Sequence, residues 1–266
     1  MAQIIAIANQ KGGVGKTTTS VNLAAALAAL RKRVLLIDMD PQANATTGVG
    51  IDKHDQPLTL NDVLLERSPA RTLLKQIGGE HSTLFALPGT PDLTEAEVTL
   101  MGASKREYRL KQVLAPLLTD FDYVIIDCPP SLNMLTVNSL VAANGVIIPM
   151  QCEYYALEGL TALMGTIEQI RGSANAQLEL FGLVRTMYDP RSNLAKDVSE
   201  QLANHFGNKL YTTVIPRNIR LAEAPSHGLP VLDYDKSSRG ALAYLALASE
   251  VLRLTQQESS EDVIEW

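Results

Sequence analysis

The sequence predicts a doubly wound α/β fold, in which a mostly parallel sheet carries helices on both faces. Two observations support this prediction. Short apolar runs rich in β-branched residues recur along the 266 residues, and helical stretches alternate with them. The runs are almost continuously apolar, as strands buried on both faces of a parallel sheet are. With 46% apolar and 20% charged residues, the chain also has the composition of a globular domain.

Each expected element follows from such a run or stretch. Strands are predicted at 4–9, 34–40, 84–89, 123–130, 145–152, 180–189 and 210–216. Helices are predicted at 17–33, 108–118, 134–145, 159–172, 194–207 and 240–254, the last packing on the sheet through its apolar side.

Two regions are less regular. Residues 53–106 contain four prolines and are expected to form surface excursions between strands. The last residues, 256–266, are acidic and are expected to be a flexible tail, which leaves residues 1–255 as one domain.

A glycine-rich stretch, KGGVGKTTT (11–19), joins the first strand to the first helix. In the phosphate-binding pattern G-x-x-x-x-G-K-[ST], backbone N–H groups wrap around phosphates, the lysine reaches the outer phosphates and the hydroxyl holds Mg²⁺. Lys16 and Thr17 fill those last two places, but Gln10 stands where the first glycine belongs and Lys11 follows it. The loop is therefore a variant of the pattern with a second lysine.

Carboxylates end two further strands. VLLIDMD ends in Asp38 and Asp40, and YVIID ends in Asp127. Ligands of open parallel sheets gather at the carboxyl ends of strands, so we expect these acids to converge on the phosphates and the metal. Asp127 follows its apolar run as a Walker B acid does, and would hold Mg²⁺ through water.

Six motifs occur together in one order: KGGVGKTTT, LLIDMDPQANAT, IIDCPPS, PMQCEYYALEGL, VIPRNIRLAEAPSHG and YDKSSRGALAYLALA. In these motifs the chain resembles the ParA/Soj family of chromosome-partitioning ATPases, within the deviant Walker A group of P-loop NTPases that also holds MinD and the nitrogenase iron protein. The resemblance runs from about residue 3 to residue 253. It implies slow Mg·ATP hydrolysis by a sandwich homodimer, binding of double-stranded DNA without sequence preference in the ATP state, and stimulation by a ParB-like partner.

The resemblance also implies roles for residues. Lys11 would be the signature lysine, which reaches across the dimer to the partner's nucleotide as an arginine finger does. Asp40 would position the attacking water, and Asp38 would help to organise the metal shell. Pro216 and Asn218 would cup the adenine. The residues expected to contact the phosphates are Lys11, Gly13, Val14, Gly15, Lys16, Thr17 and Thr18, with Thr17 also on Mg²⁺.

Arg191 and Arg220 match basic positions associated with DNA binding in the family. Arg217, Lys196, Lys236 and Arg239 could extend the same patch, although the sequence does not place them on one face. The net charge of −6 argues against a broadly basic protein, so any DNA surface is local. Contacts to phosphates alone would carry no sequence information.

Three other classes of protein compete with this interpretation. A membrane-targeted MinD-like ATPase needs a basic amphipathic helix at its end, whereas this chain ends SSEDVIEW. An iron–sulfur dimer needs cysteines at its interface, whereas Cys128 and Cys152 lie in apolar strands and are expected to be buried, reduced thiols. A plasmid-type repressor carries a helix-turn-helix domain ahead of the loop, and here the loop begins near residue 10. We therefore expect a cytoplasmic, nucleoid-associated ATPase with no membrane partner.

Overall fold

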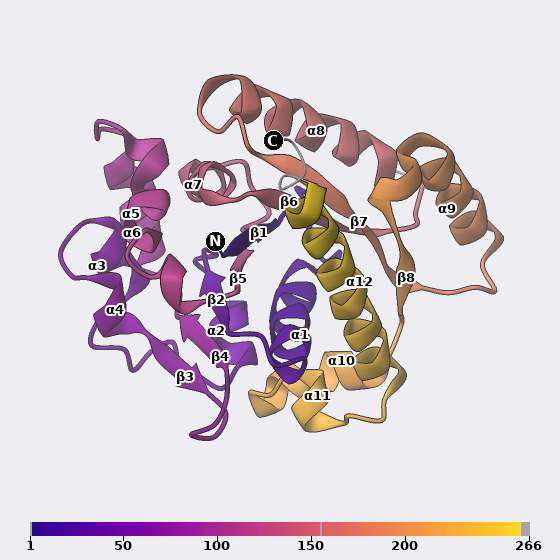
Figure 1. Cartoon of the computed structure of the whole chain (residues 1–266), viewed down its shortest axis with the longest axis horizontal. Helices are drawn as coiled ribbons and strands as arrows, with labels where there is room; N and C mark the ends of the chain where they lie inside the picture. Colours follow the sequence, from indigo (N-terminus) through magenta and orange to yellow (C-terminus); the bar gives the residue numbers. More distant parts are fainter. Residues whose placement is uncertain (1, 155, 262–266) are drawn as a thin grey trace.

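The computed structural model describes residues 2–154 and 156–261, and one sheet of eight strands runs through them (Figure 1). The order of strands is β3-β4-β2-β5-β1-β6-β7-β8. All pairings are parallel except that of β3 with β4. The strands are β1 (Gln3–Ile7), β2 (Val34–Asp38), β3 (Lys75–Ile77), β4 (Leu84–Leu87), β5 (Tyr123–Asp127), β6 (Gly145–Gln151), β7 (Glu179–Tyr188) and β8 (Leu210–Pro216). The predicted doubly wound, mostly parallel sheet is confirmed.

Helices cover both faces of the sheet, because successive side chains of each strand point to opposite sides. In β1, Ile5 and Ile7 belong to one buried cluster, and Ile4 and Ala6 to another. The first cluster lies under α1 (Lys16–Ala29), α11 (Val231–Tyr234) and α12 (Arg239–Glu261). The second lies under α5 (Leu93–Leu100), α6 (Arg109–Leu114), α7 (Met134–Ala142), α8 (Ala156–Ser173) and α9 (Asn193–Phe206).

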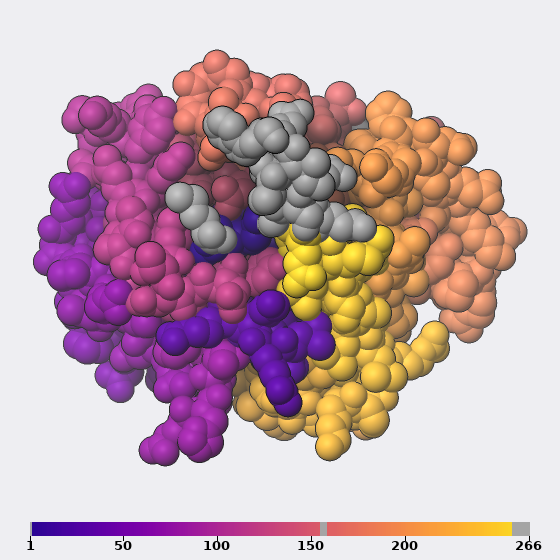
Figure 2. Space-filling view, in the orientation of Figure 1, coloured from indigo at the N-terminus to yellow at the C-terminus, as the bar shows by residue number. Residues whose placement is uncertain are grey.

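Helix α12 lies along the face shown in Figure 2, beside the indigo amino-terminal part of the chain. It also covers the edge strand β8. The Glu250 carboxylate accepts hydrogen bonds from the backbone N–H groups of Thr212, at 2.8 Å, and Thr213, at 3.1 Å. Donors of an edge strand that are satisfied in this way are not available to another chain. The contact also fixes β8, whose last residue is Pro216.

The expectation of surface excursions at 53–106 is wrong for much of that region. Besides the expected strand, β4, it contains α3 (Leu60–Leu64), α4 (Ala70–Leu73), α5 and the strand β3. Leu60, Leu73 and Leu93 are buried in the core, which explains why these short elements are ordered despite the prolines nearby. The sequence also missed α2 (Asn44–Gly48), α10 (Ile219–Glu223) and α11, together with the short 3₁₀ helices at Arg106–Tyr108, Leu118–Asp120, Gly207–Lys209 and Ala224–His227.

The final helix is longer than expected. It was predicted at 240–254, but α12 continues to Glu261, so residues 256–261 of the expected tail are helical. The remaining residues of that tail, 262–266, lie outside the described residues. None of the helices in the described part of the chain combines the length and the apolar character that a bilayer-spanning segment needs.

The strand order brings three site segments together. Strand β1 lies between β5 and β6, and β2 lies on the other side of β5. In register, Ile7 of β1 is opposite Asp127 of β5, and Asp127 is opposite Asp38 of β2. The loop after β1 and the acids that end β2 and β5 therefore emerge side by side at the carboxyl edge of the sheet, where such folds bind ligands.

Candidate nucleotide site

The loop after β1 has the backbone of a phosphate cradle. Gly13 has φ +73° and Gly15 has φ +86°, both in the left-handed region that favours glycine. Gly15 is also the N-cap of α1, whose N–H groups and positive dipole end face the loop. A Cβ on Gly13 would meet nothing within 4 Å, so glycine is required there by the backbone conformation and not by crowding.

Lys16 lies inside this cradle. The residue is only 8% exposed, and its ammonium donates a hydrogen bond to the backbone carbonyl of Lys11 at 3.2 Å. Burial lowers the pKa of Lys16, and the nearby carboxylates of Asp127 and Asp40 act in the opposite direction. A partly buried cation in the mouth of a loop of N–H donors is suited to bind an anion such as phosphate.

Asp127 is bound by two hydroxyls from α1. Thr17 donates to Oδ2 at 2.8 Å, and Ser20 donates to Oδ1 at 2.7 Å. The carboxyl is fully buried, and burial, followed by the charge of Asp38, raises its pKa to about 8. Sequence reasoning missed Ser20, although its position one helical turn after Thr17 on the same face of α1 could have indicated it.

These oxygens fit a divalent cation. Mg²⁺ prefers hard oxygen ligands and keeps several of its waters, so a threonine hydroxyl, a carboxylate and substrate phosphates suffice to hold it. Among the described residues, no three His, Cys, Asp or Glu side chains gather into a metal cluster made by the protein alone. A cation held jointly with a ligand's phosphates matches that donor set.

Asp38 has a different orientation. Its Oδ2 accepts from the backbone N–H of Thr46 at 2.7 Å and from the Thr46 hydroxyl at 2.8 Å. Its Oδ1 accepts from the backbone N–H of Asp40 at 3.2 Å. Burial raises the pKa of Asp38 to about 6. Asp38 therefore organises the chain around the site, whereas Asp40 lies in the loop that follows, with Oδ1 accepting from the Gln42 N–H at 2.9 Å.

Lys11 lies at the rim of the loop. Its side chain is 40% exposed, and its ammonium pairs with Glu153 at 2.6 Å, just after β6. The backbone N–H of Lys11 donates to the Asn9 side chain at 3.0 Å, which fixes where the loop begins. The two lysines of the loop thus have separate environments: Lys16 points into the cradle and Lys11 outward from it.

A pocket of about 200 Å³ lies beside the cradle. It is lined by residues from distant parts of the chain, among them Gly15, Thr18, Met187, Pro216, Asn218 and Tyr244. The predicted base-binding pair is thereby brought next to the phosphate loop. The Asn218 oxygen accepts from the N–H of Arg220 at 3.0 Å and caps α10, which leaves its amide NH₂ as the group able to donate to a base.

Sequence reasoning predicted the strand β7 but missed the contact that Thr186 makes near its end. Thr186 is buried, and its hydroxyl donates to the carbonyl of Val14 at 2.7 Å, which ties the phosphate loop to β7. Met187 has φ +48°, and the Gln151 amide donates to its sulfur at 2.7 Å. Thr186 follows Arg185 within β7, and no local sequence pattern indicated this contact.

Comparison with known proteins agrees with the geometry. The model of the AAA domain family matches residues 2–180. The chain is 51% identical to the sporulation initiation inhibitor protein Soj of Bacillus subtilis over 251 residues, covering 94% of this chain and 98% of Soj. It is also 51% identical to the chromosome partitioning protein ParA of Caulobacter vibrioides over 252 residues, covering 94% of each.

The chain belongs to the ParA/Soj family of chromosome-partitioning ATPases. A solved structure of similar fold contains this class of ligand: cobyrinic acid a,c-diamide synthase from Mycobacterium smegmatis, with bound ADP and magnesium, is 38% identical with a TM-score of 0.84, and 96% of each chain is covered. The predicted P-loop fold, ATPase class and nucleotide-with-magnesium chemistry are therefore confirmed for the family.

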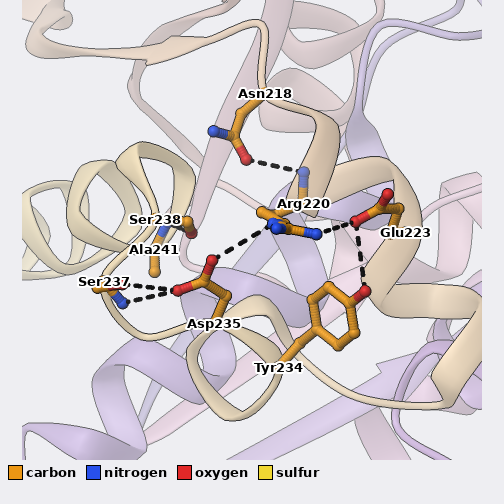
Figure 3. A network of polar contacts seen from close by, with 8 residues as sticks. All are labelled: Asn218, Arg220, Glu223, Tyr234, Asp235, Ser237, Ser238 and Ala241. Atoms are coloured by element: carbon orange, nitrogen blue, oxygen red, sulfur yellow. Dashed lines mark hydrogen bonds and ion pairs between the residues drawn. The ribbon is translucent and has the colours of Figure 1, made fainter.

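Both arginines predicted to bind DNA in this ParA/Soj chain are paired with acids. Arg191, before α9, is 88% exposed and makes a bidentate contact with Asp189, at 2.9 and 2.8 Å. Arg220, on α10, pairs with Glu223 at 2.8 Å and Asp235 at 3.4 Å (Figure 3). The further basic residues Arg217, Lys196, Lys236 and Arg239 are exposed.

The cysteines have the environments expected of structural thiols. Cys128 and Cys152 are buried and free of disulfides. Burial raises the pKa of Cys128 to about 12, so the thiol stays protonated at neutral pH. A metal cluster binds thiolates, and a protonated thiol inside the core is a poor ligand for one.

Proposed function

We propose that this chain is a DNA-segregation switch: it forms a nucleotide-sandwich homodimer with Mg·ATP, binds double-stranded DNA without sequence preference in that state, and is released when a ParB-like partner stimulates hydrolysis. It would act in the cytoplasm on the nucleoid. The observation that carries the proposal is the arrangement of Lys11. The cradle already contains Lys16, so a second lysine held at the rim by an exposed ion pair is suited to reach another subunit's nucleotide.

The contacts within the loop and around the acids support the hydrolytic roles that we propose for these residues. Backbone groups of Gly13, Val14 and Gly15 bind phosphates together with Lys16 and Thr18, and Thr17 and Asp127 hold Mg²⁺ while Asp38 organises its surroundings. Asp40 positions the attacking water. Pro216 and Asn218 hold the adenine in the pocket beside the loop. A Lys11 from the partner neutralises charge that develops on the transferred phosphoryl group.

The DNA role rests on Arg191 and Arg220. Each is neutralised in part by its own acids, and the chain carries a net charge of −6, so one monomer is a weak binder of phosphate. Dimerisation doubles the number of cations that face one duplex. ATP can therefore switch DNA affinity without a large change within each monomer.

The first experiment measures binding of the purified protein to a random-sequence duplex at physiological salt, with ATP and then with ADP. Retention with ATP alone supports the switch. If the ADP-bound monomer holds the duplex as well as the ATP form does, the proposed switch is wrong.

A matched variant tests the role of Lys11. Lys11→Ala should still bind ATP, since Lys16 and the loop remain, but should fail to dimerise and should lose about a hundredfold or more of its hydrolysis rate. Lys16→Ala serves as the comparison and should lose nucleotide binding itself. An ATP-dependent dimer of Lys11→Ala that hydrolyses at the parental rate would rule out a role in trans.

A further inference from the structure

A buried hydroxyl joins three segments behind the Asp40 loop. Thr46, in α2, is 1% exposed. Its hydroxyl lies 2.8 Å from Oδ2 of Asp38, at the end of β2, and 3.2 Å from the carbonyl oxygen of Gly89, after β4. It also accepts from the backbone N–H of Gly89 at 2.9 Å. The hydroxyl therefore uses both its donor and its acceptor capacity on segments that are distant in sequence.

These bonds close the chain around Asp40. Asp38 stands at the start of the loop and Thr46 at its end, and the Asp38 carboxylate joins the two while its other oxygen accepts from the Asp40 N–H. Within the loop, Ala43 has φ +53°, a left-handed conformation that an alanine adopts only when its surroundings impose it. The position of Asp40 is thus set by bonds at both ends of the loop.

The backbone at Gly89, after β4, lies very close to Asp38. A Cβ placed on Gly89 would lie 2.4 Å from the carbonyl oxygen of Asp38 and 3.1 Å from its carboxyl carbon. Backbone therefore packs directly against Asp38, and Thr46 is the side chain that bonds both partners. Without the Thr46 hydroxyl, the buried N–H of Gly89 would lose its acceptor, and the Asp38 carboxylate would lose one of its donors.

We propose that Thr46 is a positioning residue for hydrolysis: through Asp38 and Gly89, its hydroxyl holds the Asp40 loop in the geometry that places the attacking water. This inference rests on the proposed function, in which Asp40 positions that water. Thr46 itself touches neither the nucleotide pocket nor the phosphate loop in the contacts that define them. Its effect should therefore appear in turnover and not in substrate binding.

The test compares hydroxyl with methyl at the same position. Thr46→Val keeps the shape and the backbone bond to Asp38 but loses the hydroxyl, and should lower kcat for Mg·ATP about tenfold or more, because a small misplacement of a catalytic group is that costly. KM, and the Kd of a fluorescent ATP analogue, should stay within about twofold, since the binding groups are unchanged. Thr46→Ser should restore turnover to near the parental rate.

Controls separate positioning from general damage. Thr47→Val changes the neighbouring exposed threonine, whose hydroxyl bonds the Ala43 carbonyl at 3.1 Å, and should leave kcat unchanged. If valine prevents folding, the pair Thr46→Ala and Thr46→Ser makes the same comparison, because the two differ only in the hydroxyl. The inference is overturned if Thr46→Val keeps the parental kcat. It is also overturned if the variant loses as much nucleotide affinity as it loses kcat.

The failure of the proposed function has a different signature. Asp40→Ala should hydrolyse far more slowly than the parent, and adding Thr46→Val to it should cause no further loss, because the two act through one group. If Asp40→Ala turns over at the parental rate, the assignment of Asp40 falls. If Asp40→Ala is slow but the double variant is about tenfold slower again, Asp40 stands and Thr46 acts by another route, which overturns the inference.

Discussion

At the scale of single residues, three aspartates at or just after the end of a strand have different surroundings in the fold. Asp127 is bound by two hydroxyls and lies against Thr17, Asp38 is bound by a neighbouring threonine and two backbone N–H groups, and Asp40 lies on a loop. Burial raises the pKa of Asp127 to about 8 and that of Asp38 to about 6. Close burial of acids in this way disfavours their charged forms until a cation joins them.

The raised pKa of Asp127 predicts how stability depends on pH. Without Mg²⁺ and nucleotide, the folded state holds a proton on Asp127 up to about pH 8, whereas the unfolded chain releases it near the ordinary aspartate pKa of 3.8. The folded state therefore binds more protons between these values, and the free energy of unfolding falls as the pH rises through that window. Thermal melting from pH 5 to 8.5 should show a shallower decline for Asp127→Asn than for the parent.

The comparison depends on the slope and not on the absolute melting temperature. An asparagine keeps only one oxygen for the two hydroxyls of Thr17 and Ser20, so the variant loses some stability at every pH. Equal pH slopes in the two proteins would contradict the assignment. Mg²⁺ with ADP should stabilise the parent more at pH 8 than at pH 6, because the cation competes with the proton at Asp127.

At the scale of elements, the short helix α10 and its N-cap join the two sites that we propose. The N-cap, Asn218, lines the pocket that we propose for the base, and Arg220 follows two residues later in the DNA surface that we propose. The cap bond runs between these two residues, from the Arg220 N–H to the Asn218 oxygen (Figure 3). A ligand in this pocket and a DNA contact at Arg220 would therefore depend on the same short element.

The acid beside Arg220 predicts a gain in affinity. Glu223 pairs with the guanidinium at 2.8 Å and also accepts from the Tyr234 hydroxyl at 3.3 Å. Both charged side chains are more than a third exposed, so the pair contributes little to stability. Glu223→Gln should remove the charge of one of the two acids that pair with Arg220, and should tighten binding of the ATP form to random duplex severalfold, measured by fluorescence anisotropy at fixed salt.

Net charge alone must be separated from this local effect. Glu80→Gln removes one exposed acid between β3 and β4, at the edge of the sheet opposite β8, and should change duplex affinity much less than Glu223→Gln. Equal gains for the two variants would mean that overall charge decides, and that Arg220 is not the contact.

At the scale of the whole molecule, the sequence predicted what depends on repetitive patterns and missed what depends on tertiary contact. Seven strands were predicted from their apolar runs, which are clearest in β1, β2, β5 and β6 because these strands are buried on both faces of the sheet. Strand β3, with the pattern KQI and two exposed residues, carries no such run and was missed. Helices α3 and α4 are held by burial of Leu60 and Leu73 and not by their own length.

The site follows the same division. The phosphate loop is one short stretch of sequence, and each acid lies at or just after the end of an apolar run. The spacing of residues within each stretch therefore predicts them. Thr186 and Thr46 act through bonds to residues 172 and 43 positions away, Val14 and Gly89, and no local pattern reports such pairs. Ser20 lies between the two cases, because its partner Asp127 is distant but its neighbour on the helix face is Thr17.

The last prediction concerns the dimer as a DNA-binding unit. Asp40→Ala should bind Mg·ATP, dimerise and stay on the duplex, since the nucleotide is not turned over. Each phosphate contact adds about −0.9 to the slope of log affinity against log salt, so the slope of this trapped dimer should be about twice that of a nucleotide-free monomer.

Arg220→Glu in the same background should still dimerise, by light scattering, but should show a flatter slope and weaker binding. A trapped dimer whose slope equals that of the monomer would mean that the second subunit brings no cations to the duplex, and that ATP changes affinity by rearranging each monomer.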